Sequence, residues 1–203
     1  MKTLFLLAAL FFAGVCMGQS IYQSIETVEA DGITFVVKRA KYASLIYNSD
    51  YHYINESPLH YKDGRELETK EEYEAIDAQK NTAGELRALR EVFGDDFITA
   101  MRAYKRSEMI ICYVVDSDGK ILEIAFIVSA QPEFMALPMT TFAALERKLR
   151  QYVTWKPNDF AKQLEYFNGR GYINFHNVPI SSEIKVIKND FLWNQAQDGE
   201  LHE

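Results

Sequence analysis

The chain has 203 residues, with 22 lysines and arginines against 29 aspartates and glutamates, and its formal net charge is -7 at pH 7. An acidic chain without a cluster of basic residues argues against nucleic acid or an anionic membrane as a partner. The length allows one large domain or two small ones.

The N-terminal segment has the layout of a secretory signal peptide. A short positive start is followed by an apolar block at 4–12 and a stretch rich in small residues at 13–18. We expect cleavage after Gly18, which leaves Gln19 as the new terminus of a secreted or periplasmic protein without a membrane span in the mature chain. The alternative is a lipoprotein that is lipid-anchored through Cys16.

A hairpin is the strongest structural signal after the leader. Residues 109–115 are apolar and β-rich, 116–119 read Asp-Ser-Asp-Gly, and 121–128 form a second apolar run. Asp-Gly supplies the positive φ angles that a hairpin turn needs. Cys112 lies inside the first run, where a thiol behaves as a small hydrophobe. The pattern therefore predicts a strand pair at the centre of the core.

An amphipathic helix follows the hairpin. Its apolar residues fall at helical spacing, namely Phe142, Leu145, Leu149, Tyr152 and Val153. A second helix, or two short ones with a break at Gly94, is predicted from Glu85 onward. The polar stretch 66–80 is expected to be a solvated helix or a loop.

The remaining patterns predict short strands and turns. Strands are expected over 33–38, 42–47 and 51–54. A turn is expected at 168–171, and an edge strand over 172–180, because proline lies within it. A last short strand over 184–187 is also expected. We therefore predict an α+β fold with an antiparallel or mixed sheet and helices packed mainly on one face.

Three segments follow the leader in this interpretation. They are an N-terminal α+β segment (19–106), a hairpin-helix-strand segment (107–190) and a polar tail (191–203), and the first two could form one continuous domain.

Three parts of the C-terminal half carry a resemblance: the hairpin, the helix that ends in Trp155-Lys156-Pro157 and the strand that reaches Val178-Pro179-Ile180. Together they resemble the C-terminal domain of TonB-type proteins. That resemblance implies strand addition by a partner peptide. The edge residues would be Tyr172, Phe175 and Val178. The whole chain also looks like the small secreted bacterial proteins that are grouped in families of unknown function.

The sequence contains no pattern that is typical of a catalytic or metal site. The histidines do not have zinc-ligand spacing, and neither a phosphate loop nor a nucleophile elbow occurs. We therefore expect neither a metal nor another cofactor and assign no catalytic residue. The leading hypothesis is a non-enzymatic binding module for a protein, peptide or carbohydrate. The alternative is a secreted hydrolase with a carboxylate/His site assembled from loops.

One compositional feature suggests a ligand-binding surface. Tyrosines are concentrated between residues 42 and 61, and tyrosine offers a flat apolar ring with a polar tip that suits sugars and peptides. The alternative is that these rings pack against the edge of the sheet. The candidate ligand-binding residues are Tyr42, Tyr47, Tyr51, Tyr53, Tyr61 and His52.

Overall fold

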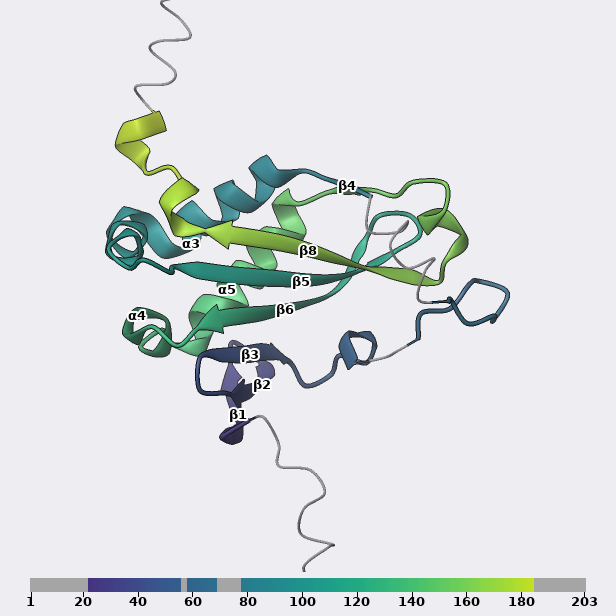
Figure 1. The fold of residues 1–203 in the computed structure, drawn as a ribbon, viewed down its shortest axis with the longest axis horizontal. Helices are drawn as coiled ribbons and strands as arrows, with labels where there is room; N and C mark the ends of the chain where they lie inside the picture. Colours follow the sequence, from purple (N-terminus) through teal and green to yellow (C-terminus); the bar gives the residue numbers. More distant parts are fainter. Residues whose placement is uncertain (1–21, 56–57, 69–77, 185–203) are drawn as a thin grey trace, which may run out of the picture.

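A six-stranded antiparallel sheet with strand order β1-β2-β3-β6-β5-β8 forms the centre of the computed structural model (Figure 1). The structure describes residues 22–55, 58–68 and 78–184. The strands of this sheet are β1 (Ser24–Ala30), β2 (Ile33–Arg39), β3 (Ala43–Asn48), β5 (Glu108–Asp116), β6 (Ile121–Ser129) and β8 (Tyr166–Asn174). The first three come from the predicted N-terminal segment and the last three from the C-terminal one. Strand β3 pairs with β6, so both segments contribute to one continuous sheet.

The predicted hairpin is confirmed. Strands β5 and β6 are antiparallel partners around a turn in which Gly119 has a φ of 87°. The carboxylate of Asp116 accepts hydrogen bonds from the backbone N–H groups of Asp118 and Lys120, both at 2.9 Å. These bonds fix the turn, and Ile111, Tyr113 and Phe126 of the two strands lie in the core.

Two long helices cover one face of the sheet, which confirms the predicted α+β class. Helix α5 (Met139–Tyr152) passes behind the strands in Figure 1 and buries Phe142, Leu145 and Leu149 completely. Helix α3 (Thr82–Arg102) packs against α5, and Gly94, with a φ of 72°, breaks it as predicted. The short helix α4 (Pro132–Met135) buries Phe134 between these elements.

Short elements complete the described chain. They are the two-stranded sheet of β4 (Gln79–Lys80) and β7 (Trp155–Lys156) and the 3-10 helices η1 (Tyr53–Asn55), η2 (Ala161–Gln163) and η3 (Phe175–Asn177). Helix α5 ends three residues before Trp155, because the chain turns there to pair with β4.

The other face of the sheet carries no α-helix within the described residues, and we call it the open face. Strand register places its side chains in two neighbouring rows that cross all six strands. The first row is Ile25, Lys38, Leu45, Ile127, Ile110 and Tyr172, and the second is Thr27, Val36, Tyr47, Ala125, Cys112 and Arg170. In Figure 1 this face points towards the viewer, with α5 behind it.

The predicted strand over 51–54 is wrong. Its last residues form η1, and the backbone N–H groups of His52, Tyr53 and Ile54 donate to the carboxylate of Glu123 at 2.6, 3.0 and 2.7 Å. The Glu123 carboxylate on β6 thus accepts the backbone hydrogen bonds that a neighbouring strand would otherwise accept. The sequence pattern of tyrosines gave no indication of this.

The predicted turn at 168–171 is also wrong, because these residues lie in the middle of β8. Gly169 and Gly171 face the covered side, where a Cβ would overlap the indole of Trp155 and the carboxylate of Glu85, respectively. The glycines therefore permit close packing rather than a turn. The predicted strand over 172–180 ends at Asn174, where the side-chain oxygen of that residue accepts from the N–H of His176 and starts η3.

Several predictions fall partly or wholly outside the described residues. These are the leader with Cys16, most of the polar stretch at 66–80 and the tail at 191–203. Of the expected strand over 184–187, only residue 184 is described, and it is helical. Within the described part of the chain, no helix combines the length and the apolar character that crossing a membrane requires.

Candidate functional site

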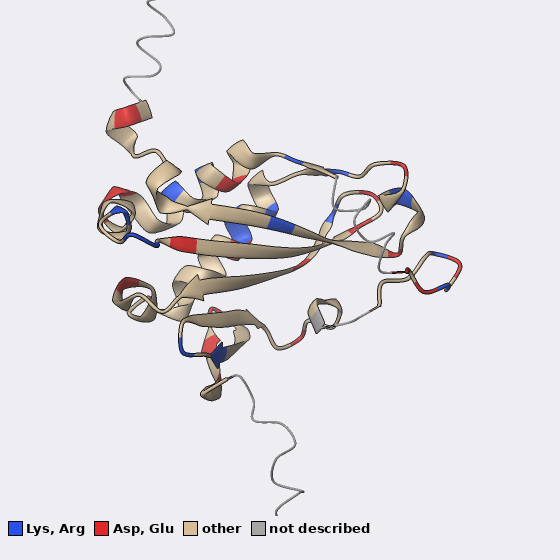
Figure 2. Cartoon of the chain, in the orientation of Figure 1, with Lys and Arg blue, Asp and Glu red and all other residues tan. Residues whose placement is uncertain are grey.

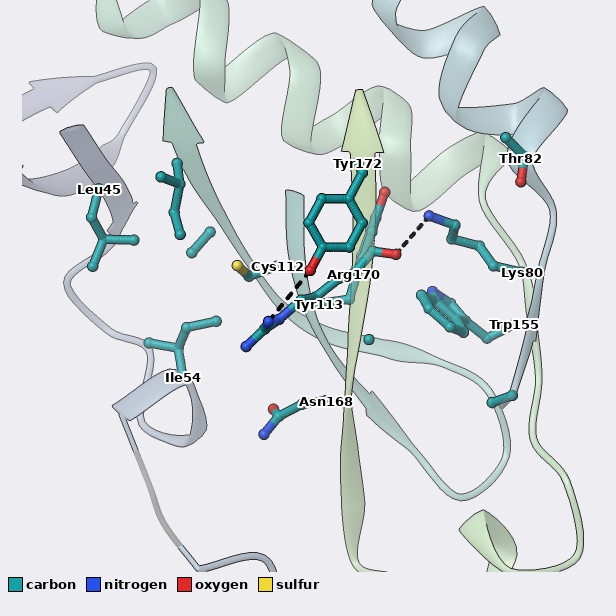
Figure 3. Close-up of a pocket in the computed structure, with 14 residues that line it drawn as sticks. Leu45, Ile54, Lys80, Thr82, Cys112, Tyr113, Trp155, Asn168, Arg170 and Tyr172 are labelled. Carbon is teal, nitrogen blue, oxygen red and sulfur yellow. Dashed lines mark hydrogen bonds between the residues drawn. The ribbon is translucent and has the colours of Figure 1, made fainter. Parts of the chain in front are cut away.

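A cavity of about 740 Å³ lies at the edge strand β8 and is lined by residues from both sides of this strand. Figure 3 places Leu45 and Ile54 on one side of this strand and Lys80, Thr82 and Trp155 on the other. The first side belongs to the open face, and the second lies beyond the outer edge of the sheet. Ligand cavities in proteins commonly measure about 300–1,000 Å³, so the size suits a small molecule or a short peptide segment.

The floor of the cavity on the open face is apolar. Leu45, Ile127 and Cys112 are half-buried, and Ala125 between them is fully buried. Burial raises the pKa of the Cys112 thiol, while the charge of the facing Arg170 opposes that rise. Because a raised pKa favours the neutral thiol, Cys112 contributes an apolar surface to the floor.

One wall is formed by η1. Ile54 lines the cavity, and Tyr53 packs on Tyr166 with the ring centroids 4.5 Å apart. The three backbone hydrogen bonds to Glu123, which is 4% exposed, hold η1 against this end of the sheet. The wall is therefore fixed by a buried carboxylate whose charge is satisfied by N–H donors.

Beyond the edge of β8 lies a buried ionic cluster. Lys80 forms a salt bridge of 2.6 Å with Glu85 and also donates to the carbonyl of Arg170 at 3.0 Å. The hydroxyl of Tyr113 donates to Glu85 at 2.7 Å. Burial, followed by the charge of Glu85, raises the pKa of Tyr113 well above its usual value, so the hydroxyl keeps its proton. Both ions of the cluster have partners, and the cluster ties β4 and α3 to β8.

Charge is distributed unevenly around the cavity. In Figure 2 the central strands are mostly uncharged, and a basic residue stands in the middle of β8. This residue is Arg170, an exposed side chain that donates to the hydroxyl of Tyr172 at 3.4 Å. Among the described lining residues, the charged ones are Lys80 and Arg170, and both are cations.

The structure does not bring the predicted tyrosines together into one surface. Tyr47 and Tyr61 are buried, under Lys38 and against Phe160 respectively. The hydroxyl of Tyr51 donates to Glu146 of α5 and accepts from Arg150. Tyr42 is 74% exposed and lies before β3, outside the cavity lining. Tyr53 contributes to the η1 wall through its contact with Tyr166. The side chain of His52 is exposed.

The predicted strand-edge residues have different environments. Tyr172 is 70% exposed on β8 and lines the cavity. Phe175 and Val178 lie beyond the end of the strand and are 0% and 1% exposed, so neither presents a strand edge. Strand addition to β8 therefore stays a prediction that concerns Tyr172 alone of these three residues.

The described lining of the cavity contains neither a carboxylate nor a histidine. The ring of His176 instead bonds to the carbonyl of Tyr104 at 2.9 Å, and the backbone of His60 pairs with Glu66. Within the described residues, no group of three or more histidine, cysteine or acidic side chains could hold a metal ion.

Sequence reasoning named Tyr172 as a strand-edge residue but missed Asn168 and Arg170, which also line the cavity on β8. A signal was present, because the run from Asn168 to Tyr172 alternates glycine with larger residues. Such alternation indicates a strand with one closely packed face and one face that carries side chains. Lys80 and Trp155 approach β8 only through the fold and have no local pattern.

The fold and cavity define an α+β protein in which helices cover one face of an antiparallel sheet, while no α-helix of the described residues covers the other. The model of the family described as a domain of unknown function, DUF5043, matches residues 19–169, and the chain belongs to this family. A crystal structure of a DUF5043 family protein from Bacteroides uniformis ATCC 8492 is similar in fold, with a TM-score of 0.61 and 20% sequence identity. The match covers 77% of this chain and 89% of that chain. No curated protein matches. These findings agree with the expected family of unknown function, and they do not confirm the resemblance to TonB-type proteins.

Proposed function

We propose that this protein is a secreted or periplasmic binding module whose ligand occupies the cavity on the open face. The supporting observation is a cavity of about 740 Å³ with an apolar floor on the side of the sheet that carries no described α-helix. Apolar cavities with a few polar side chains are the usual form of ligand sites. The leader at residues 1–18 supports the location, and the alternative of a lipid anchor at Cys16 belongs to the same proposal.

The half-buried floor residues support a ligand rather than a purely structural role for this face. On the covered face, Met109, Ile111 and Phe126 are 0% exposed, whereas Cys112 and Ile127 on the same two strands remain partly accessible. Covering such apolar surface is favourable by about 25 cal/mol per Å². A ligand with an apolar part would therefore gain free energy on this floor.

Nile red, an uncharged dye that fluoresces in apolar surroundings, tests the proposal. We expect the full chain to bind the dye saturably. Cys112→Trp fills the floor and should abolish this binding. Thr27→Trp is the matched control, because Thr27 lies in the same cross-strand row as Cys112 but outside the cavity. It should leave dye binding unchanged.

Circular dichroism and the urea midpoint establish that each variant is folded. If Cys112→Trp fails to fold, Ile127→Asp replaces it, because this half-buried side chain lies on the same floor. Equal dye binding by a folded floor variant and by the unaltered protein would overturn the proposed site. Separation of cell fractions, with Cys16→Ser as the comparison, tests secretion against lipid anchoring.

A further inference from the structure

We infer that the ligand of the open face is an amphipathic anion, a long-chain carboxylate whose hydrocarbon lies on the floor and whose head group meets Arg170. This inference rests on the proposed function and specifies its ligand class. The floor determines the apolar part of the ligand, and the charge of the cavity lining determines the head group.

The floor favours hydrocarbon over a sugar or another polar ligand. Leu45 and Ile127 are cross-strand neighbours in one row, and Ala125 and Cys112 are neighbours in the next. Three of these four side chains have no hydrogen-bonding group, and the thiol of Cys112 bonds only weakly. A hydroxyl-rich ligand placed here would lose its bonds to water without replacement, which is unfavourable. A hydrocarbon chain loses nothing on the same surface.

The charges that line the cavity favour an anionic head group. Among the described residues that line the cavity, the charged ones are Lys80 and Arg170. Both are cations, in a chain whose formal net charge is -7. Lys80 does not add to this field, because its salt bridge with Glu85 neutralises it. Arg170 therefore gives the described lining of the cavity a positive charge, which attracts an anion.

Of the two cations in the described lining of the cavity, Arg170 is the one on the open face. It faces Cys112 across the β5–β8 pair, and its side chain lies beside Tyr172, which is 70% exposed. A guanidinium offers several N–H donors in a planar arrangement that matches a carboxylate. Arg170 already makes contacts within the protein, so the carboxylate head group would bind the guanidinium in addition to these contacts. Lys38 lies on β2, four strand spacings away, roughly 19 Å at about 4.8 Å per strand. The hydrocarbon would extend from Arg170 across the floor in that direction.

Displacement of Nile red by three amphiphiles with the same twelve-carbon chain tests the head group. They are dodecanoate, dodecyl maltoside and dodecyltrimethylammonium, each used below its micelle concentration. We expect dodecanoate to displace the dye at a concentration at least about tenfold lower than either of the others, since charge-assisted hydrogen bonds are the strong ones. Raising the salt concentration should reduce this preference.

Arg170→Gln should weaken dodecanoate about tenfold and leave dodecyl maltoside unchanged. Arg147→Gln is the matched control, since it also removes one positive charge, but from α5 on the covered side, where Arg147 pairs with Asp31 at 2.9 Å. As a second readout, dodecanoate should slow labelling of the Cys112 thiol in a Cys16→Ser chain, because the hydrocarbon would cover the floor.

Equal displacement by the three amphiphiles, or an equal effect of Arg170→Gln on all of them, would overturn the anionic head while leaving an apolar site in place. Tighter binding of the maltoside would replace the carboxylate with a sugar head group. Absence of dye binding by the unaltered protein would overturn the proposed function and this inference together.

Discussion

The carboxylate of Glu85 lies so close to Gly171 that the Cβ of any other residue at position 171 would overlap it. Glu85 is 1% exposed and is held by Lys80 and Tyr113, so it has little freedom to move. We predict that Gly171→Ala lowers the free energy of unfolding by about 1–3 kcal/mol, the usual cost of overpacking. Urea denaturation measures this loss. Asn168→Ala on the same strand points to the other face and should change stability by less than about 0.5 kcal/mol. Equal stability of Gly171→Ala and the unaltered protein would show that the Glu85 cluster can shift.

Glu123 fixes the wall of the cavity through three backbone N–H groups. Glu123→Ala leaves these donors without their acceptor, and we expect a loss of about 2–4 kcal/mol in the free energy of unfolding. Hydrogen exchange at His52, Tyr53 and Ile54 should accelerate in the same variant. Glu108→Ala removes an exposed carboxylate from β5 and serves as the control. Unchanged exchange at the three amides would contradict the assigned role.

Leu149 joins α5 to the covered face of the sheet and is 0% exposed. Leu149→Ala should cost about 2–5 kcal/mol, because it removes buried methyl groups and leaves a cavity. The measurement is the urea midpoint at constant m-value. Gln151→Ala, two residues further along the same helix and exposed, should fall within about 0.5 kcal/mol of the unaltered protein. Similar midpoints for both variants would contradict this packing.

Glu91 connects α3 to α5 and gives stability a specific dependence on pH. Hydrogen bonds from Lys148, and then from Arg87 and Tyr152, lower the pKa of its carboxyl from 4.5 to about 2. A lowered folded pKa means that the stabilisation is present above pH 4.5 and is lost as the pH falls towards 2. The stability of Glu91→Gln should therefore decline less than that of the unaltered protein across this interval. Carboxyl NMR titration should show that Lys148→Met raises the pKa of Glu91. An unchanged pKa in that variant would contradict the assigned cause.

The sequence alone determined the elements whose signals are local. Alternating and continuous apolar runs predicted β2, β3 and the β5–β6 hairpin, because the period of a strand and the Asp-Gly turn depend only on neighbouring residues. Helical spacing gave α5, and Gly94 gave the break in α3. These signals were sufficient for the α+β class with helices on one face.

Only the tertiary structure decided how the cavity is built, because its residues are distant in sequence. A strand was predicted at 51–54, but the segment ends in η1 because its backbone N–H groups donate to Glu123. A turn was predicted at the glycines of 168–171, but these residues lie in the middle of β8, where the glycines allow Trp155 and Glu85 to pack closely. Pairing of β3 with β6 aligned Leu45 with Ile127. The tyrosines concentrated between residues 42 and 61 make separate contacts in the fold and do not form one surface. A local pattern specifies the dihedral angles and exposed faces of an element, whereas a site depends on which elements meet, and long-range packing decides that.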